Sequence, residues 1–171
     1  MKLIAAVDKN WGIGYRGELL ARVRADLRDH FAPLTTGRVV ILGSRTLATF
    51  PGGRPLKNRT NIILSRRKDF SVEGAVVVHS LEELLSECKK YNPDDLFVIG
   101  GGSIYSLLLP YCEYAYITEF DKAFEADTYI TNLDNSDEWE LVFTGSDQIS
   151  DPATDSEPNL VFRFKEYRCI Q

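Results

Sequence analysis

The sequence predicts a single α/β domain over residues 1–171, built on a mixed, mostly parallel sheet of about eight strands with helices on both faces. Two observations predict this fold. Short runs of branched apolar residues recur along the first two thirds of the chain, and amphipathic segments typical of helices separate them. The last third carries strand-like segments with no helix between them, which indicates a C-terminal antiparallel hairpin.

The predicted strands of the parallel part are nearly all apolar instead of alternating, and they are bounded by Gly, Asp, Asn or Ser. A strand that is buried on both faces of a parallel sheet has this pattern. Near the C-terminus, residues 147–158 are polar and contain two prolines, so we expect a long loop that closes the antiparallel pair. The expected strands are residues 2–7, 38–42, 60–65, 75–79, 96–99, 115–120, 139–145 and 160–167.

The segments between the first strands have helical character. One of them follows Ser80, and Glu83 three residues later completes a capping box, which is a start signal for a helix. Another runs from a glycine triplet to Pro110, where a helix is expected to end. The expected helices are residues 24–31, 44–50, 81–91 and 103–109.

Composition and charge argue against several classes of protein. The formal net charge of -5 argues against a nucleic-acid binder, which normally presents a basic face. No apolar run is long enough to cross a membrane and no signal-peptide pattern is present, so we expect a cytoplasmic protein without a membrane contact. Cys88, Cys112 and Cys169 are widely spaced and odd in number, which argues against disulfides and a zinc site. No metal is expected.

Three predicted strands end in residues that suit a ligand, and ligands of α/β sheets bind beyond the carboxyl ends of the strands. Residues 96–99 lead into Gly100, Gly101 and Gly102 and then a helix. Backbone without side chains can approach a flat ring or a pyrophosphate, and a helix N-terminus offers free N–H groups. The alternative is a tight turn between strand and helix.

The other two strand ends carry hydroxyl and basic side chains. Residues 38–42 lead into Gly43-Ser44-Arg45-Thr46, which suits a phosphate at a helix start. The alternative is that Ser44 only caps the helix. Residues 60–65 lead into Arg66, Arg67 and Lys68, which suit a phosphate monoester beside a ribose or form a solvated turn.

Two features precede these strand ends in the chain. Residues 8–17 form a glycine-punctuated segment in which Trp11, Ile13 and Tyr15 supply apolar area, a composition typical of a lid over a site. Asp26 then enters the first helix, where an acid is commonly an N-cap or a first-turn residue.

Together these segments resemble the dihydrofolate reductase family along almost the whole chain. The resemblance implies that family's fold, a monomer, and an NADPH-dependent reduction of 7,8-dihydrofolate to 5,6,7,8-tetrahydrofolate by hydride transfer to pterin C6 and protonation at N5. The likeness is carried by seven motifs in the family's order: LIAAVDKNWGIG (3–14), ADL (25–27), VVILGSRT (39–46), GRPLKNRTNIILS (53–65), VIGGGSIY (98–105), YIT (116–118) and EADTYI (125–130).

The resemblance implies catalytic residues and a substrate site. Asp26 matches the only ionisable group beside the pterin, and burial would raise its pKa and help protonation at N5. Thr118 matches the hydroxyl that supports this carboxylate. Arg59 matches the arginine that grips the α-carboxylate of the glutamate tail. The expected substrate-binding residues are Ile4, Ala5, Asp26, Leu27, His30, Phe31, Thr49, Phe50, Arg59, Ile99 and Thr118.

The resemblance also implies a site for NADPH along the three strand ends. The glycine triplet would lie under the nicotinamide and pyrophosphate, with a cis peptide between Gly100 and Gly101, and residues 11–16 would form the mobile lid. The expected cofactor-binding residues are Ala6, Ile13, Gly14, Gly43, Ser44, Arg45, Thr46, Leu64, Ser65, Arg66, Ile99, Gly100, Gly101, Gly102, Ser103, Ile104 and Tyr105.

Four positions depart from the family's pattern. The tryptophan of a usual Leu-Pro-Trp sequence is Ala21, and a usual proline is Arg24. The charges of Arg22 and Arg24 would lower the pKa of Asp26 if these side chains pointed inward. The spacing from Asp26 to the turn at residues 35–37 is one residue longer than expected, which leaves His30 or Phe31 as the pocket aromatic.

The fourth departure concerns the 2′-phosphate of the cofactor. The family often places an arginine where this chain has Ser44, so Arg45 or Arg66 is left to bind that phosphate.

Two other functions stay open at this point. The pyrimidine reductase of riboflavin synthesis has a similar fold and cofactor, but its substrate has no glutamate tail for Arg59 to bind. A folate- or nucleotide-binding protein without turnover would account for the altered residues 21–24. The acid Asp26, with Thr118 and the glycine triplet, favours the folate enzyme over both.

Overall fold

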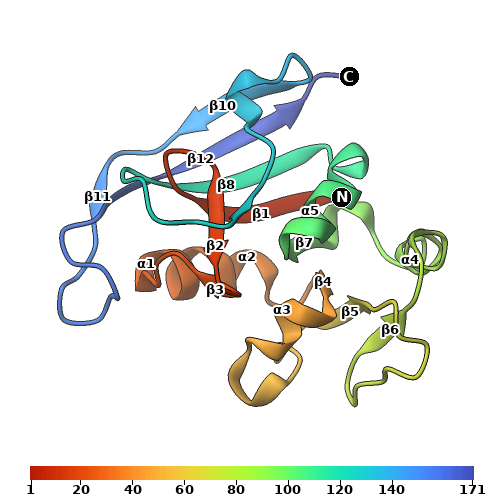
Figure 1. Cartoon of the computed structure of the whole chain (residues 1–171). Coiled ribbons are helices and arrows are strands. Elements are labelled where there is room, and N and C mark those ends of the chain that lie inside the picture. Colours follow the sequence, from red (N-terminus) through yellow and green to blue (C-terminus); the bar gives the residue numbers. More distant parts are fainter.

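A computed structural model describes all of residues 1–171 as one α/β fold (Figure 1). The main sheet has the strand order β10-β12-β8-β1-β7-β4-β5-β6, and β11 pairs with β12. The predicted fold class, with its mixed and mostly parallel sheet, is confirmed. The strands are β1 (Lys2–Val7), β4 (Val39–Gly43), β5 (Thr60–Leu64), β6 (Val76–Val78), β7 (Leu96–Gly100), β8 (Tyr114–Phe120), β10 (Trp139–Thr144), β11 (Gln148–Ile149) and β12 (Val161–Cys169).

The strands of the N-terminal part run parallel and bring their carboxyl ends to one edge of the sheet. β1 pairs in parallel with β7 and β8, and β4 pairs in parallel with β5 and β7. Ala6 lies beside Thr118, and Gly43 lies beside Leu64. The predicted antiparallel hairpin is formed by β12, which pairs with both β10 and β8.

Helices cover both faces of this sheet, as predicted. The helical segments are α1 (Arg24–Asp26), η1 (Leu27–Phe31) and α2 (Ala32–Thr35), which follow one another without a break, and α3 (Ser44–Ala48), α4 (Leu81–Cys88) and α5 (Gly102–Leu108). Short 3-10 turns are η2 (Pro51–Gly53), η3 (Pro93–Asp95), η4 (Leu109–Tyr111) and η5 (Leu133–Asn135).

The apolar strands are buried on both faces, which explains their continuous hydrophobic pattern. Successive side chains of a strand point to opposite faces, and Val40 and Ile41 of β4 are both 0% exposed. Ile41 packs with Leu84 of α4 and Leu108 of α5 in the larger core cluster. Val40 packs on the other face in a cluster with Leu47 of α3.

The capping signal before α4 is confirmed in part. The backbone N–H of Glu83 donates to Ser80 Oγ at 3.1 Å, so Ser80 is the N-cap. The Glu83 carboxylate accepts the backbone N–H of His79 at 2.8 Å instead of closing the box on Ser80. None of the helices has both the length and the apolar character that crossing a membrane requires.

A second, three-stranded sheet lies where the sequence predicted only a lid-like loop. It consists of β2 (Gly12–Tyr15), β3 (Glu18–Leu19) and β9 (Thr128–Tyr129), in the order β3-β2-β9. Trp11 is 3% exposed, and its ring packs edge-on against Tyr167 at 5.8 Å between centroids. The prediction of a loop was incomplete because these strands are short, β2 contains two glycines, and its partner β9 lies far along the chain.

Candidate active site

Asp26 is a buried carboxylate at the edge where the parallel strands end. It is the third residue of the helical segment that begins at Arg24, and it is 7% exposed. Thr118 of β8 donates its hydroxyl to Asp26 Oδ1 at 2.6 Å. Burial raises the pKa of Asp26 to about 6, although the hydrogen bond from Thr118 opposes the rise. A carboxyl group with a pKa near neutrality is suited to general acid–base chemistry.

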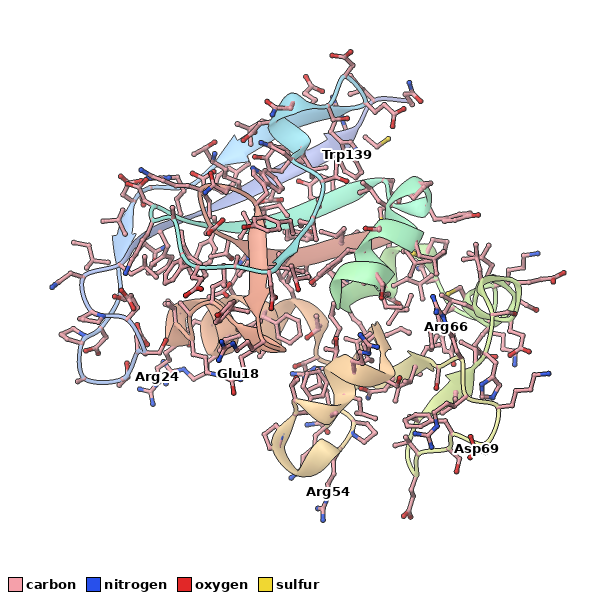
Figure 2. The ribbon with its side chains drawn as sticks, viewed as in Figure 1. Glu18, Arg24, Arg54, Arg66, Asp69 and Trp139 are labelled. Carbon is pink, nitrogen blue, oxygen red and sulfur yellow. The ribbon has the colours of Figure 1, made fainter.

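The nearby arginines do not contribute to the shifted pKa of the Asp26 carboxylate. Arg22 and Arg24 are both exposed, and in Figure 2 the Arg24 side chain points away from the core. The two causes of the shifted Asp26 pKa are burial and the Thr118 hydroxyl. The inward arginine considered from the sequence is therefore not what the structure has.

The helix below Asp26 contains one π turn, in which the backbone N–H of Ala32 donates to the Leu27 carbonyl five residues earlier. A π turn accommodates one more residue than an α turn, which matches the extra residue noted in the sequence. His30 faces the sheet, where its ring stacks on Phe164 at 4.0 Å and 20°. Phe31 lies instead beside Arg59, whose guanidinium is 5.8 Å from the Phe31 ring.

Arg59 is a cation with unused hydrogen-bonding capacity. Its Nη2 donates to Thr36 Oγ1 at 3.2 Å, whereas its Nε is buried without a hydrogen-bond partner. Burial lowers the pKa of the Arg59 guanidinium, which nevertheless stays charged at neutral pH. An unpaired N–H on a planar cation suits a carboxylate of a ligand.

The glycine triplet lies at the carboxyl end of β7. The Gly100–Gly101 peptide is cis, and Gly100 has a φ of 140°. A Cβ on Gly102 would lie 2.6 Å from Thr128 Cγ2 of β9. A side chain at position 102 would force Thr128 to shift, so packing against β9 favours a glycine there independently of any ligand.

Hydroxyl and basic side chains line the same edge. Gly43 is the N-cap of α3 and makes no side-chain capping bond, so Ser44 is not the cap that the alternative interpretation required. Ser44 and Thr46 are half-buried, and Arg45, Ser103 and Arg66 are exposed. Free hydroxyls and guanidiniums beside the ends of parallel strands are the donor set that phosphate groups need.

Other predicted residues take up varied positions around this edge. The Tyr105 hydroxyl donates to the Ile4 carbonyl at 2.7 Å, so one lone pair of that carbonyl is in use. Thr49 is exposed and donates its hydroxyl to the Thr46 carbonyl at 2.6 Å. Phe50 packs against the smaller core cluster around Leu47. The remaining members of the predicted set are buried or half-buried: Ala5, Ala6, Ile13, Gly14, Leu27, Leu64, Ser65, Ile99 and Ile104.

Two buried or paired carboxylates that sequence analysis did not single out organise the glycine-rich segment. Asp8 is 1% exposed and accepts backbone N–H groups from Gly12 at 2.8 Å and Phe124 at 3.0 Å. Asp127 accepts the backbone N–H of Arg16 at 2.9 Å. An Asp directly after a strand and before an Asn and glycines is a turn signal, so Asp8 was detectable; the partner of Asp127 lies too far along the chain.

Comparison with known proteins fits this geometry. The family model described as dihydrofolate reductase matches residues 1–168. The chain belongs to the dihydrofolate reductase family. It is 36% identical over 142 residues to the dihydrofolate reductase of Bacillus subtilis, covering 83% of this chain and 81% of that protein. It is 41% identical over 120 residues to that of Mycobacterium tuberculosis, covering 70% of each.

A solved dihydrofolate reductase has the same fold. The structure of the Enterococcus faecalis enzyme complexed with NADP(H) and RAB-propyl superposes with a TM-score of 0.84 at 32% identity, covering 99% of this chain and 96% of that one. Family membership, rather than the fold alone, therefore favours the folate enzyme over the pyrimidine reductase considered from the sequence.

Proposed function

We propose that this protein is a dihydrofolate reductase, which converts 7,8-dihydrofolate to 5,6,7,8-tetrahydrofolate with NADPH as the cofactor. The observation that carries the proposal is the buried Asp26 carboxylate, held by the Thr118 hydroxyl at 2.6 Å, in a chain of this family. A lone carboxylate in a buried site suits a substrate that must gain a proton during its reduction.

The substrate lies between this carboxylate and Arg59 in the proposed complex. Asp26 hydrogen-bonds the pterin ring, and because its pKa is about 6 it exchanges protons near neutral pH and helps N5 to become protonated. Phe31 packs against the ring system, and the unpaired Nε of Arg59 binds the carboxylate of the glutamate tail. His30 faces the sheet, so we assign the pocket aromatic to Phe31.

The edge formed by β4, β5 and β7 fits NADPH. Half-buried or exposed Ser44, Thr46 and Ser103 would hold the phosphates, with Arg45 or Arg66 for the 2′-phosphate. When bound, the cofactor supplies the hydride that adds to C6 of the pterin. The chain's own contribution is orientation of the two rings and exclusion of water.

The decisive assay follows the absorbance of NADPH in the presence of dihydrofolate, with and without an antifolate. Oxidation that the antifolate inhibits is the expected result. Antifolate binding without NADPH oxidation would identify a binding protein that lacks turnover. The absence of both antifolate binding and NADPH oxidation would refute the proposal. The monomeric state and the cytoplasmic location expected from the sequence belong to this proposal, and sedimentation of the purified protein tests the first of them.

A further inference from the structure

The helix that carries Asp26 has no cap of its own. Its N-cap position is Val23, which has extended backbone angles (φ −117°, ψ 122°) and a side chain that cannot accept a hydrogen bond. The first N–H groups of a helix have no partner within the helix. Here Asp155, which is 131 positions away, accepts the backbone N–H of Arg24 through Oδ1 at 2.9 Å.

The loop that supplies Asp155 is organised around this carboxylate. Oδ2 of Asp155 accepts the backbone N–H of Asp151 at 2.8 Å, and the Asp155 N–H donates to the Asp151 carbonyl at 2.9 Å. Both carboxylate oxygens are therefore used: Oδ2 accepts within the loop, and Oδ1 accepts both from the helix and from the Thr154 hydroxyl of the loop at 3.2 Å. Figure 1 shows this loop between β11 and β12, beside α1.

Two further residues of the loop contact the rest of the chain. The backbone N–H of Arg22 donates to Ser156 Oγ at 2.8 Å, and the Ser156 N–H donates to the Arg22 carbonyl at 3.0 Å. Glu157 forms an ion pair with Lys122. The loop thus contacts the segment before the helix on both sides of Val23.

The contact acts on the turn that holds Asp26. The Asp26 N–H donates to the Val23 carbonyl at 3.0 Å, so Asp26 ends the turn whose first N–H Asp155 accepts. A negative charge at the start of a helix also complements the helix dipole. Loss of this contact is expected to loosen the first turn and to shift the Asp26 carboxylate relative to Thr118 on the sheet.

The helix needs this partner because residue 24 is not a proline and so has a backbone N–H. Proline, the residue usual at this position in the family, has no N–H and is well tolerated as the first residue of a helix. The extended Val23 is compatible with a following proline. The substitution Arg24→Pro therefore removes the donor without requiring a new backbone conformation.

We propose that Asp155 is a positioning residue of the reaction, which caps the Asp26 helix from the β11–β12 loop. The inference rests on the proposed function, because its consequence is the placement of Asp26 during dihydrofolate reduction. The experiment is a double-mutant cycle of Asp155→Ala and Arg24→Pro, with Asp155→Asn as the conservative variant. Asp137→Ala is the control, because Asp137 is an exposed acid outside this loop.

Asp155→Ala is expected to lower kcat about tenfold, because a small displacement of a catalytic group can lower the rate at least by this factor. KM for NADPH is expected to stay unchanged. Asp155→Asn is expected to keep more of kcat than Asp155→Ala, because its amide oxygen still accepts the Arg24 N–H although its NH2 group cannot accept the Asp151 N–H. In the Arg24→Pro background, Asp155→Ala is expected to have no further effect. Amide exchange at Asp26 and Leu27, which both donate to the Val23 carbonyl, is expected to follow the same pattern.

An equal loss of kcat in both backgrounds, or no loss from Asp155→Ala, would overturn the inference. If Asp155→Ala does not fold, the double variant with Arg24→Pro is expected to fold, because proline needs no cap; failure of both would also overturn it. A wild-type protein that does not oxidise NADPH refutes the proposed function whatever the exchange rates are. The two failures are therefore distinguishable.

Discussion

Replacing Asp26 by Asn is expected to stabilise the folded protein at neutral pH while it removes most of the turnover. Burial raises the pKa of Asp26 from 3.8 to about 6. The native state thus binds the proton more tightly than the unfolded state does, so stability is highest at low pH and falls as the pH rises through this interval. At about 1.36 kcal/mol for each pH unit, ionised Asp26 costs about 3 kcal/mol at neutral pH.

Asparagine has no such cost and keeps the shape of the side chain. Its amide oxygen still accepts the Thr118 hydroxyl, which lies 2.6 Å from Oδ1 in the wild-type chain. The buried side-chain atoms without a hydrogen-bond partner are His30 Nε2 and Arg59 Nε, so neither oxygen of Asp26 is buried and unpaired. The new amide group is therefore not expected to add a buried, unsatisfied donor.

Urea unfolding of the two proteins at several pH values tests this reasoning. The Asp26→Asn protein is expected to be more stable by up to about 3 kcal/mol at pH 7.5, by about half of that at pH 5, and by about a fifth of it at pH 4. Turnover is expected to fall sharply at neutral pH and to recover at low pH, where the substrate is already protonated, with NADPH binding retained. If Asp26→Asn raises the free energy of unfolding equally at every pH, or if the wild type is the more stable protein at pH 7.5, the buried charge does not destabilise the fold.

Three further substitutions test the rest of the site. Arg59→Lys is expected to raise KM for dihydrofolate more than it lowers kcat, because lysine cannot bind a carboxylate in a bidentate way; an unchanged KM would place the tail elsewhere. Of Arg45→Ala and Arg66→Ala, the one that removes the 2′-phosphate ligand is expected to raise KM for NADPH about tenfold and leave KM for NADH unchanged, and two unaffected variants would contradict the assignment. His30→Phe is expected to raise the free energy of unfolding by about 1 kcal/mol, since it removes a buried unpaired nitrogen; a raised KM for dihydrofolate would instead put His30 in the pocket.

The sequence predicted the strands of the main sheet to within one or two residues at most ends. Residues 2–7 were predicted at their observed bounds, and residues 96–99 missed only Gly100. Strands buried on both faces are apolar at every position, so their limits are visible where polar or glycine residues begin. The helices predicted at residues 44–50 and 81–91 were too long by two and three residues, because amphipathic patterns continue into the turns that follow helices. The helix predicted at residues 24–31 was too short, since the helical segments continue to Thr35.

The elements that escaped prediction depend on contacts between distant segments. β9 has two residues and pairs with β2, more than a hundred positions earlier. The cap that Asp155 provides leaves no local pattern either, because its partner is the backbone of Arg24 and any residue type there except proline has the same N–H. The carboxylate of Asp26 was found through the resemblance, and its burial through the structure.

The π turn is a case in which two sequence signals had to be combined. The spacing after Asp26 showed one extra residue but not where the helix holds it. Pro33 follows this turn. A proline inside a helix has no N–H to donate to the carbonyl four residues earlier, and its ring clashes with that carbonyl. For Pro33 this is the carbonyl of Asp29. Widening the preceding turn takes up the extra residue where the regular ladder is already interrupted. Five residues instead of four then make one turn, so Phe31 lies beside Arg59 and His30 stacks on Phe164. Pro33 thus accounts for the position of the extra residue, and with it for the different surroundings of the His30 and Phe31 side chains.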